Sequence, residues 1–250
     1  MDQESHVLDI APIQTPRKGN VLADMLREKI LSNKLREGDQ LPSERELVER
    51  SGISRASVRE ALSLLEAEKL ISTRQGRNGG ATVRRPVPAI MTRPIQMLIR
   101  GRQLPFSAVV EIREALEPSA ARLAALHRTE EQLRAIETAC DELEANLSDV
   151  DAYLKANMRW HMSVVEASQN DLLIGFMTAL VDVIHEATKI DELAKPENRT
   201  AVARAHRRVT DAIRSGDGDA ARRRMERHVI AYSEKVTPLA PAQIAIGAKL

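Results

Sequence analysis

Three of the six histidines in this 250-residue chain are spaced as the ligands of a metal ion would be. His206 lies ten residues before a Gly-Asp-Gly segment at 216–218, and His228 lies ten residues after it. If that segment joins two antiparallel helices, both side chains stand at the same height, about 15 Å from the turn. Asn157 and His161 are four residues apart and share one face of a third helix. Three imidazoles and an amide oxygen would suit a divalent metal, with zinc the first expectation, although such spacing also fits ordinary surface or core histidines.

A second group of side chains suits DNA. Arg55 and Arg59 are four residues apart and share one helical face, from which arginine forks can pair with O6 and N7 of guanine in the major groove. Ser54 and Ser57 open the same segment and suit phosphate contacts, while Arg45 lies in the preceding helix, which crosses the DNA backbone in such motifs. Taken singly, these arginines could be ordinary surface charges. The order of the surrounding elements favours DNA binding.

A third candidate is Arg113, which lies in the apolar, alanine-rich segment VVEIREALEPSAA. A guanidinium near an apolar interior needs an anionic partner. Glu117, one helical turn on, would satisfy it. Alternatively, Arg113 binds the carboxylate of a small organic acid, and in that case Ile112 and Leu116 should face the interior of the bundle. The sequence leaves both alternatives open.

The DNA-directed side chains need a compact set of short elements between residues 17 and 85. Apolar residues at helical spacing predict a first helix from Asn20 to about residue 33. Ser43 and Glu46 form a capping box that starts a second helix, and Gly52 should end it. Ser54 caps a third helix that runs to about residue 68. LISTR and ATVRR, which flank QGRNGG, then predict a β-hairpin, so the segment reads as a winged helix-turn-helix.

The histidines belong to a second segment that is helical almost throughout. We predict helices at about 107–127, 129–147, 149–168, 171–190, 197–215 and 219–236, which would form an all-α bundle. Prolines 86, 88 and 94 interrupt helix formation before it, with a short helix at about 89–100. The predicted fold is therefore mostly α. Its predicted parts are a flexible N-terminus (1–16), the winged domain (17–85), a linker with a bridging helix (86–105), the helical domain (106–238) and a tail (239–250).

Bulk properties fit a protein of the cytoplasm. The chain is 43% hydrophobic and 29% charged, its single cysteine fits a reducing compartment, and its first residues lack a secretory pattern. No apolar stretch approaches the roughly 20 residues that cross a bilayer, so we expect no membrane partner. Residues 17–85 hold 15 Lys and Arg against 10 Asp and Glu, a basic balance that points to a polyanion for this part alone.

The string LPSERELVERSGISRASVREALSLLEAEKLI, followed by a glycine-bearing wing, resembles the DNA-binding domain of the GntR family of bacterial regulators. The resemblance covers about residues 20–84 and implies that Arg45, Arg55 and Arg59 contact bases or phosphates. It also implies that Gly76 approaches the minor groove at the wing tip. Ser54, Ala56 and Ser57 stand where the family contacts DNA with small residues.

Residues 106–236 are similar to the FadR C-terminal, or FCD, ligand-binding domain. The segments that carry the likeness are EIREALEPSAARLAA, RWHMSVVEASQNDLL and AHRRVTDAIRSGDGDAARRRMERH. In metal-binding members of that branch the ligands are an aspartate and three histidines, which map onto position 157 and onto His161, His206 and His228. Asn157 departs from the aspartate, and its neutral amide oxygen should bind metal more weakly. The arginine that corresponds to Arg113 often faces the pocket in this branch.

These observations predict a transcription regulator, not an enzyme. We expect a homodimer that binds a pseudo-palindromic operator on double-stranded DNA, acts as a repressor and responds to a small carboxylate-bearing metabolite. One alternative is a metal sensor in which the histidine site is itself the effector site. The other is a metal-dependent hydrolase, which lacks a base beside the histidines because Glu166 should lie on a different helical face from His161.

Overall fold

The computed structural model describes residues 17–74, 80–188 and 195–236, which form ten α-helices, one 3-10 helix and two β-strands. The chain divides into two compact units, Met1–Pro86 and Val87–Leu250, and each is described by itself. The segments 1–16 and 239–250 and the wing-tip Gly76 lie outside the described residues. The mostly α fold with a two-stranded hairpin in the first unit and an all-helical second unit is confirmed.

The first unit is a three-helix arrangement followed by a hairpin. Its core is a cluster of buried apolar side chains, and α3 contributes the four residues that its spacing predicted, Val58, Ala61, Leu62 and Leu65. Helix α3 packs against α1, α2 and β1. Its elements are α1 (Lys18–Leu31), α2 (Glu44–Ser51), α3 (Arg55–Ala67), β1 (Ile71–Arg74) and β2 (Gly80–Val83).

Local signals fix the turn between α2 and α3. Ser43 and Glu46 form both bonds of the predicted capping box. Gly52 follows α2 in the left-handed conformation at φ 67°, which side chains with a Cβ rarely adopt. Ser54 then accepts a hydrogen bond from the Ser57 amide and starts α3. The short glycine turn therefore sets the angle at which α3 leaves α2.

The hairpin pairs β1 and β2 in antiparallel register, with Ile71 opposite Val83. An additional bridge joins Gln40 to Thr82, and the Gln40 side-chain amide donates to the Thr82 hydroxyl at 2.8 Å. The segment before α2 therefore extends the hairpin on one side. Sequence periodicity gives no signal for this contact because it involves a single residue.

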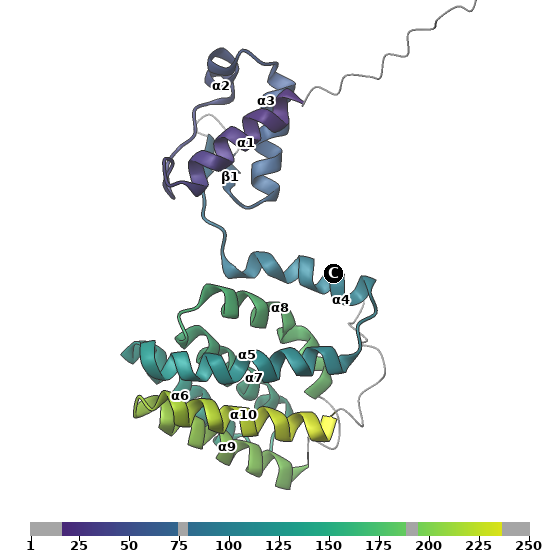
Figure 1. Cartoon of the computed structure of the whole chain (residues 1–250), viewed down its shortest axis with the longest axis vertical. Helices are drawn as coiled ribbons and strands as arrows, with labels where there is room; N and C mark the ends of the chain where they lie inside the picture. Colours follow the sequence, from purple (N-terminus) through teal and green to yellow (C-terminus); the bar gives the residue numbers. More distant parts are fainter. Residues whose placement is uncertain (1–16, 75–79, 189–194, 237–250) are drawn as a thin grey trace, which may run out of the picture. The chain divides into compact units, whose positions relative to one another are not determined.

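The second unit is a bundle in which α5 and α10 run side by side, as Figure 1 shows. Helix α7 packs against α5, α6 and α8, while α9 contacts α5, α6 and α10. The 3-10 helix η1 and α4 pack on α8. The elements are η1 (Pro88–Met91), α4 (Thr92–Gly101), α5 (Phe106–His127), α6 (Glu130–Ala145), α7 (Val150–Ala167), α8 (Asp171–Thr188), α9 (Pro196–Arg214) and α10 (Gly218–Val236).

Two expectations about local structure are wrong. Pro94 does not interrupt a helix: it lies in the first turn of α4, where backbone amides have no intrahelical partner to lose. Ile112 does not face the interior, because 43% of its surface is exposed. Arg113 and Glu117 are themselves the buried polar residues of α5. Within the described ranges, no helix is long and apolar enough to cross a membrane.

Candidate metal centre, effector cavity and DNA-contacting helix

The helical unit brings the three selected histidines together. Helices α9 and α10 meet at Gly216, which adopts φ 74°, and this turn sets His206 opposite His228 with their Nε2 atoms 3.0 Å apart. His161 on α7 places its Nε2 atom 3.4 Å from that of His228. One ring nitrogen of each histidine lies within 4.8 Å of the others, and all three side chains are buried.

Packing holds the ring of His206 in place. The indole of Trp160 stacks on it at 3.7 Å between ring centroids with an interplanar angle of 8°. The indole N–H in turn donates to the Thr210 hydroxyl at 2.9 Å, so Trp160 is itself oriented by α9. Trp160 is fully buried and adjoins His161 in the sequence.

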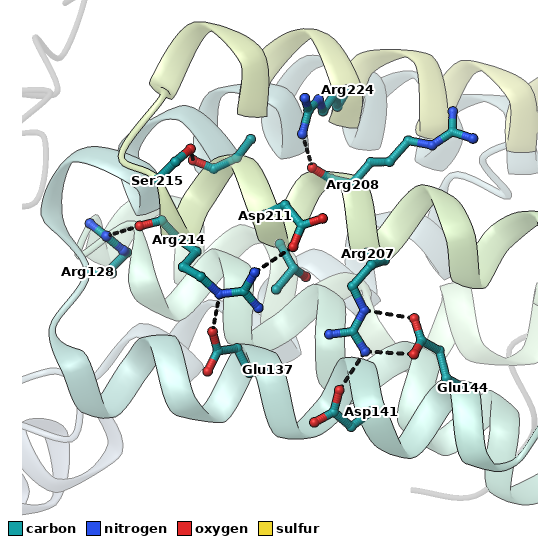
Figure 2. A network of polar contacts seen from close by, with 12 residues as sticks. Arg128, Glu137, Asp141, Glu144, Arg207, Arg208, Asp211, Arg214, Ser215 and Arg224 are labelled. Atoms are coloured by element: carbon teal, nitrogen blue, oxygen red, sulfur yellow. Dashed lines mark hydrogen bonds and ion pairs between the residues drawn. The ribbon is translucent and has the colours of Figure 1, made fainter.

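Ion pairs on another face of α9 fix the rotation of this helix. Arg207 donates to both carboxylate oxygens of Glu144 on α6, at 2.8 and 2.7 Å, and to Asp141 at 2.5 Å (Figure 2). Arg214 donates to Glu137 at 2.7 Å in the same way. Single surface pairs are worth about 0–1 kcal/mol, but this network spans two turns of α9. It therefore helps to keep His206 directed into the bundle.

Glu117 links the histidine cluster to Arg113. One carboxylate oxygen accepts from Arg113 Nε at 2.5 Å, and the other lies 2.6 Å from Nδ1 of His161. Arg113 thus pairs with Glu117, which is one of the two alternatives that the sequence left open. Glu117 shares its carboxylate between Arg113 and His161. Arg113 also lies over the Tyr232 ring at 4.6 Å, and its Nη1 atom has no hydrogen-bond partner among the described residues.

The electrostatics favour neutral imidazoles at His206 and His228. Burial favours the neutral form of Glu117, but the charge of Arg113, aided by His161, outweighs it and holds the pKa of that carboxyl well below its usual range. Because Glu117 contacts His161 at Nδ1, the Nε2 atom of that ring is the one directed towards His228. Burial lowers the pKa of His228 to about 3 and lowers the pKa of His206 well below its ordinary value.

The donor set fits a divalent cation. For tetrahedral zinc with Zn–N bonds of about 2.0–2.1 Å, neighbouring ligand nitrogens stand about 3.3 Å apart, and the 3.0 and 3.4 Å separations at His228 bracket this value. Glu117 supplies the hydrogen bond that usually orients a ligating histidine. Asn157 lies one turn before His161 on α7 and would add a neutral amide oxygen to the candidate ligands.

His161 and His228 line a cavity of about 320 Å³ between α5, α7, α9 and α10, whereas His206 is fully buried and does not line it. This volume lies within the range of small-molecule sites. No Asp or Glu of the described chain lines the cavity, so its lining carries a strong positive charge. Five cationic side chains line it: Arg113, Arg208, Arg224, Arg227 and Lys235.

The candidate DNA-contacting residues lie at the start of α3. Ser54 is the N-cap, and its hydroxyl oxygen lies 3.0 Å from that of Ser57 in the first turn, where Arg55 and Ala56 are exposed. Arg59 lies one turn after Arg55 and is 70% exposed. These residues share the start of one helix, whose opposite face is buried in the core.

Two of the candidate arginines have acidic neighbours. Arg59 Nε donates to Glu44 Oε2 at 3.1 Å across the helix-turn-helix, and Arg45 Nε lies 3.7 Å from Glu49 on α2. Both pairs are largely exposed. Contact with a DNA base would therefore require Arg59 to exchange Glu44 for the base.

Sequence reasoning missed three contributors to the centre. The tie from Glu117 to His161, the stacking of Trp160 and the support from Thr210 all cross between helices. Glu117 was considered only as a partner of Arg113, because that contact lies within one helix. The tryptophan next to His161 was the one signal available, as a large side chain beside a candidate ligand.

Comparison with known proteins assigns both parts of the chain. The model of the gntR family of bacterial regulatory proteins matches residues 18–81, and the FCD domain model matches residues 108–231. A solved structure described as Streptococcus agalactiae GntR covers 86% of this chain and 99% of its own, with a TM-score of 0.64 and 24% identity. That likeness supports the fold.

Two curated relatives extend over most of both chains. The HTH-type transcriptional regulator LutR of Bacillus subtilis (strain 168) is 30% identical over 80% of this chain and 92% of its own length. The galactonate operon transcriptional repressor of Escherichia coli (strain K12) is 30% identical over 83% of this chain and 91% of its own. With its helix-turn-helix, hairpin and helical FCD unit, the chain belongs to the GntR family of bacterial DNA-binding transcription regulators, in the FadR-type branch.

Proposed function

We propose that this regulator binds a pseudo-palindromic operator as a homodimer and represses transcription until a small organic acid occupies the cavity of the helical unit. One chain offers one α3, and a two-fold axis would present two such helices to successive major grooves. Repression is supported by the likeness to the galactonate operon regulator, which is a repressor. We expect it to act in the cytoplasm, where the chromosome lies.

The observation that carries the acid effector is the lining of the cavity. Arg113, His161 and His228 meet there, with further cations and with no acid among its described residues. Glu117 accepts from Nε of Arg113, but Nη1 of Arg113 has no hydrogen-bond partner among the described residues, so a carboxylate in the cavity could accept from it. Galactonate, after which the operon of one relative is named, is an acid of the chemical class that such a site would take.

We further propose that His161, His206, His228 and Asn157 hold a divalent metal, with zinc as the first choice for an imidazole-rich site. A bound ion would supply open coordination positions and two positive charges. Since Asn157 is neutral, the protein ligands cancel none of that charge. An effector carboxylate would then be needed to neutralise the site, so metal and effector should strengthen each other's binding.

The experiment is a thermal-shift titration of purified protein with galactonate and other hydroxy acids, with and without zinc. An effector should raise the melting temperature with the logarithm of its concentration above Kd, and the rise should be larger with metal present. A metal sensor is the second candidate, because three buried histidines with ligand atoms within 4.8 Å of one another could by themselves form the effector site for a metal. It predicts that zinc alone changes operator affinity and that acids add nothing.

A further inference from the structure

Three arginines line the side of the cavity that is nearer the turn between α9 and α10. Arg208 on α9 and Arg224 on α10 lie between the histidines and the α9–α10 turn in sequence, and Arg227 directly precedes His228. At 1.5 Å per residue, they are displaced from the histidines by about 2–6 Å along the helices. Arg208 and Arg227 are exposed, and Arg224 is half-buried.

These arginines are not neutralised by the protein. Arg207 and Arg214, on the same helix as Arg208, are held by carboxylates of α6, as Figure 2 shows. In contrast, none of the cavity's three arginines forms an ion pair with a carboxylate in the described part of the chain. Arg224 donates to the backbone carbonyl of Arg208 and so ties the two together (Figure 2).

We propose that Arg208, Arg224 and Arg227 form a second anion subsite, so that the effector of this regulator carries two anionic groups. The inference rests on the proposed acid effector and specifies its class. One carboxylate would lie at the inner end with Arg113 and the histidines, and a second carboxylate or a phosphate would lie at the arginines. Guanidinium forks suit both groups because they donate paired, charge-assisted hydrogen bonds.

The geometry favours a small molecule over a macromolecule. Arg208, Arg224 and Arg227 line the same 320 Å³ cavity as His161 and Arg113, so one ligand can contact the inner and outer groups at once. Arg113 and His161 are only 3% exposed, which excludes a rigid macromolecular surface from the inner end. The axial displacement of about 2–6 Å between the arginines and the histidines corresponds to a chain of a few carbon atoms.

The test compares matched acids that differ only in the distal group. Malate is paired with 2-hydroxybutyrate, glucarate with gluconate, and 6-phosphogluconate with gluconate, each measured by calorimetry on the zinc-loaded full chain. At least one dianion should bind about tenfold more tightly than its monoanionic match, the effect of one charge-assisted contact. The malate and glucarate comparisons test whether the second subsite binds a carboxylate, and the 6-phosphogluconate comparison tests whether it binds a phosphate.

Substitutions of the arginines test whether they form the second anion subsite. Arg208→Gln and Arg227→Gln should each remove most of the dianion's advantage while the Kd of the monoanion stays within twofold. Both side chains are exposed, so the variants should fold. Arg222→Gln removes the same charge outside the cavity, where Arg222 pairs with Glu226, and should preserve the advantage.

Two outcomes would overturn the inference. If monoanions bind as well as their matched dianions, or if the advantage survives in the Arg208 and Arg227 variants, no second subsite exists and the acid effector stands without it. If none of the acids binds, the proposed acid effector itself fails, and the inference fails with it.

Discussion

Glu117 is the side chain on which the buried centre depends most. Its two oxygens serve Arg113 and His161, at 2.5 and 2.6 Å, in a site from which solvent is excluded. Removing its charge would leave Arg113 without a counter-ion and His161 without a fixed orientation. Both consequences are costly in a buried environment.

Glu117→Gln should therefore weaken zinc binding by about 10–100-fold, the usual effect of losing the group that orients a ligand. Competition with a chromophoric chelator measures this affinity. Glu114→Gln on the same helix is the control, because Glu114 is half-buried and lies outside the cavity. Equal zinc affinity in the two variants would show that Glu117 does not support the site.

The proposed ligands should behave as one set. His161→Ala, His206→Ala and His228→Ala should each lower the zinc content from one ion per chain towards zero and lose similar amounts of zinc-dependent thermal stability. Asn157→Asp should bind zinc more tightly, because a carboxylate replaces a neutral amide, and should show weaker coupling between zinc and acid. Elemental analysis that finds no metal in reconstituted wild-type protein would refute the centre.

At the start of α3, Arg55→Ala should cost about 1–3 kcal/mol of specific DNA binding if the side chain pairs with a guanine. Arg59→Ala should cost less, because Arg59 must first leave Glu44. Glu44→Ala should then tighten DNA binding. Fluorescence anisotropy with operator DNA measures all three, and unchanged affinity in both arginine variants would contradict the assignment.

Spacing predicted that His206 faces His228, because an antiparallel hairpin places residues equidistant from its turn at equal height. His161 was paired only with Asn157 on its own helix, and the family resemblance supported all of them as one set. The spacing argument could not predict that Glu117 contacts His161, because the two residues lie on different helices and no regular spacing in the sequence relates them. Arg113 was identified as a cation in an apolar helix, but the sequence could not decide between Glu117 and a ligand. The structure shows the Glu117 pair and also places Arg113 in the cavity wall.

At the scale of elements, caps and glycines were the most reliable signals. The predicted capping box at Ser43 forms, and the structure shows a second one at Thr129; each depends on side chains within four residues. The wrong expectation at Pro94 arose because a proline can either end a helix or begin one, and the choice depends on packing. Here η1 and α4 pack together on α8.

Gly52→Ala should destabilise the first unit by about 1–2 kcal/mol, because a Cβ in the left-handed region is strained. It should also weaken DNA binding, since the turn sets the angle between α2 and α3. Gly101→Ala is the matched control: this glycine has a negative φ and open space around it, so alanine there should be neutral or slightly stabilising. Urea unfolding measures both, and equal effects would contradict the role of the turn.

At the scale of the whole molecule, the proposed DNA-contacting residues and the proposed ligand cavity lie in separate units. A ligand in the second unit can regulate the first only if it binds two states of the protein with different affinity. Couplings of this kind are typically about 1–3 kcal/mol. The sequence resemblance predicted both units, since each carries its own local motifs, whereas the coupling between them leaves no pattern in the sequence.

The most direct test measures the affinity of the zinc-loaded protein for an operator isolated from its own genome, with and without the acid that binds most tightly. The acid should change this affinity by about 5–150-fold. Arg113→Lys, which keeps the charge beside Glu117 but loses the guanidinium fork, should bind DNA as the wild type does and lose most of the response. An operator affinity that no bound acid changes would contradict the account.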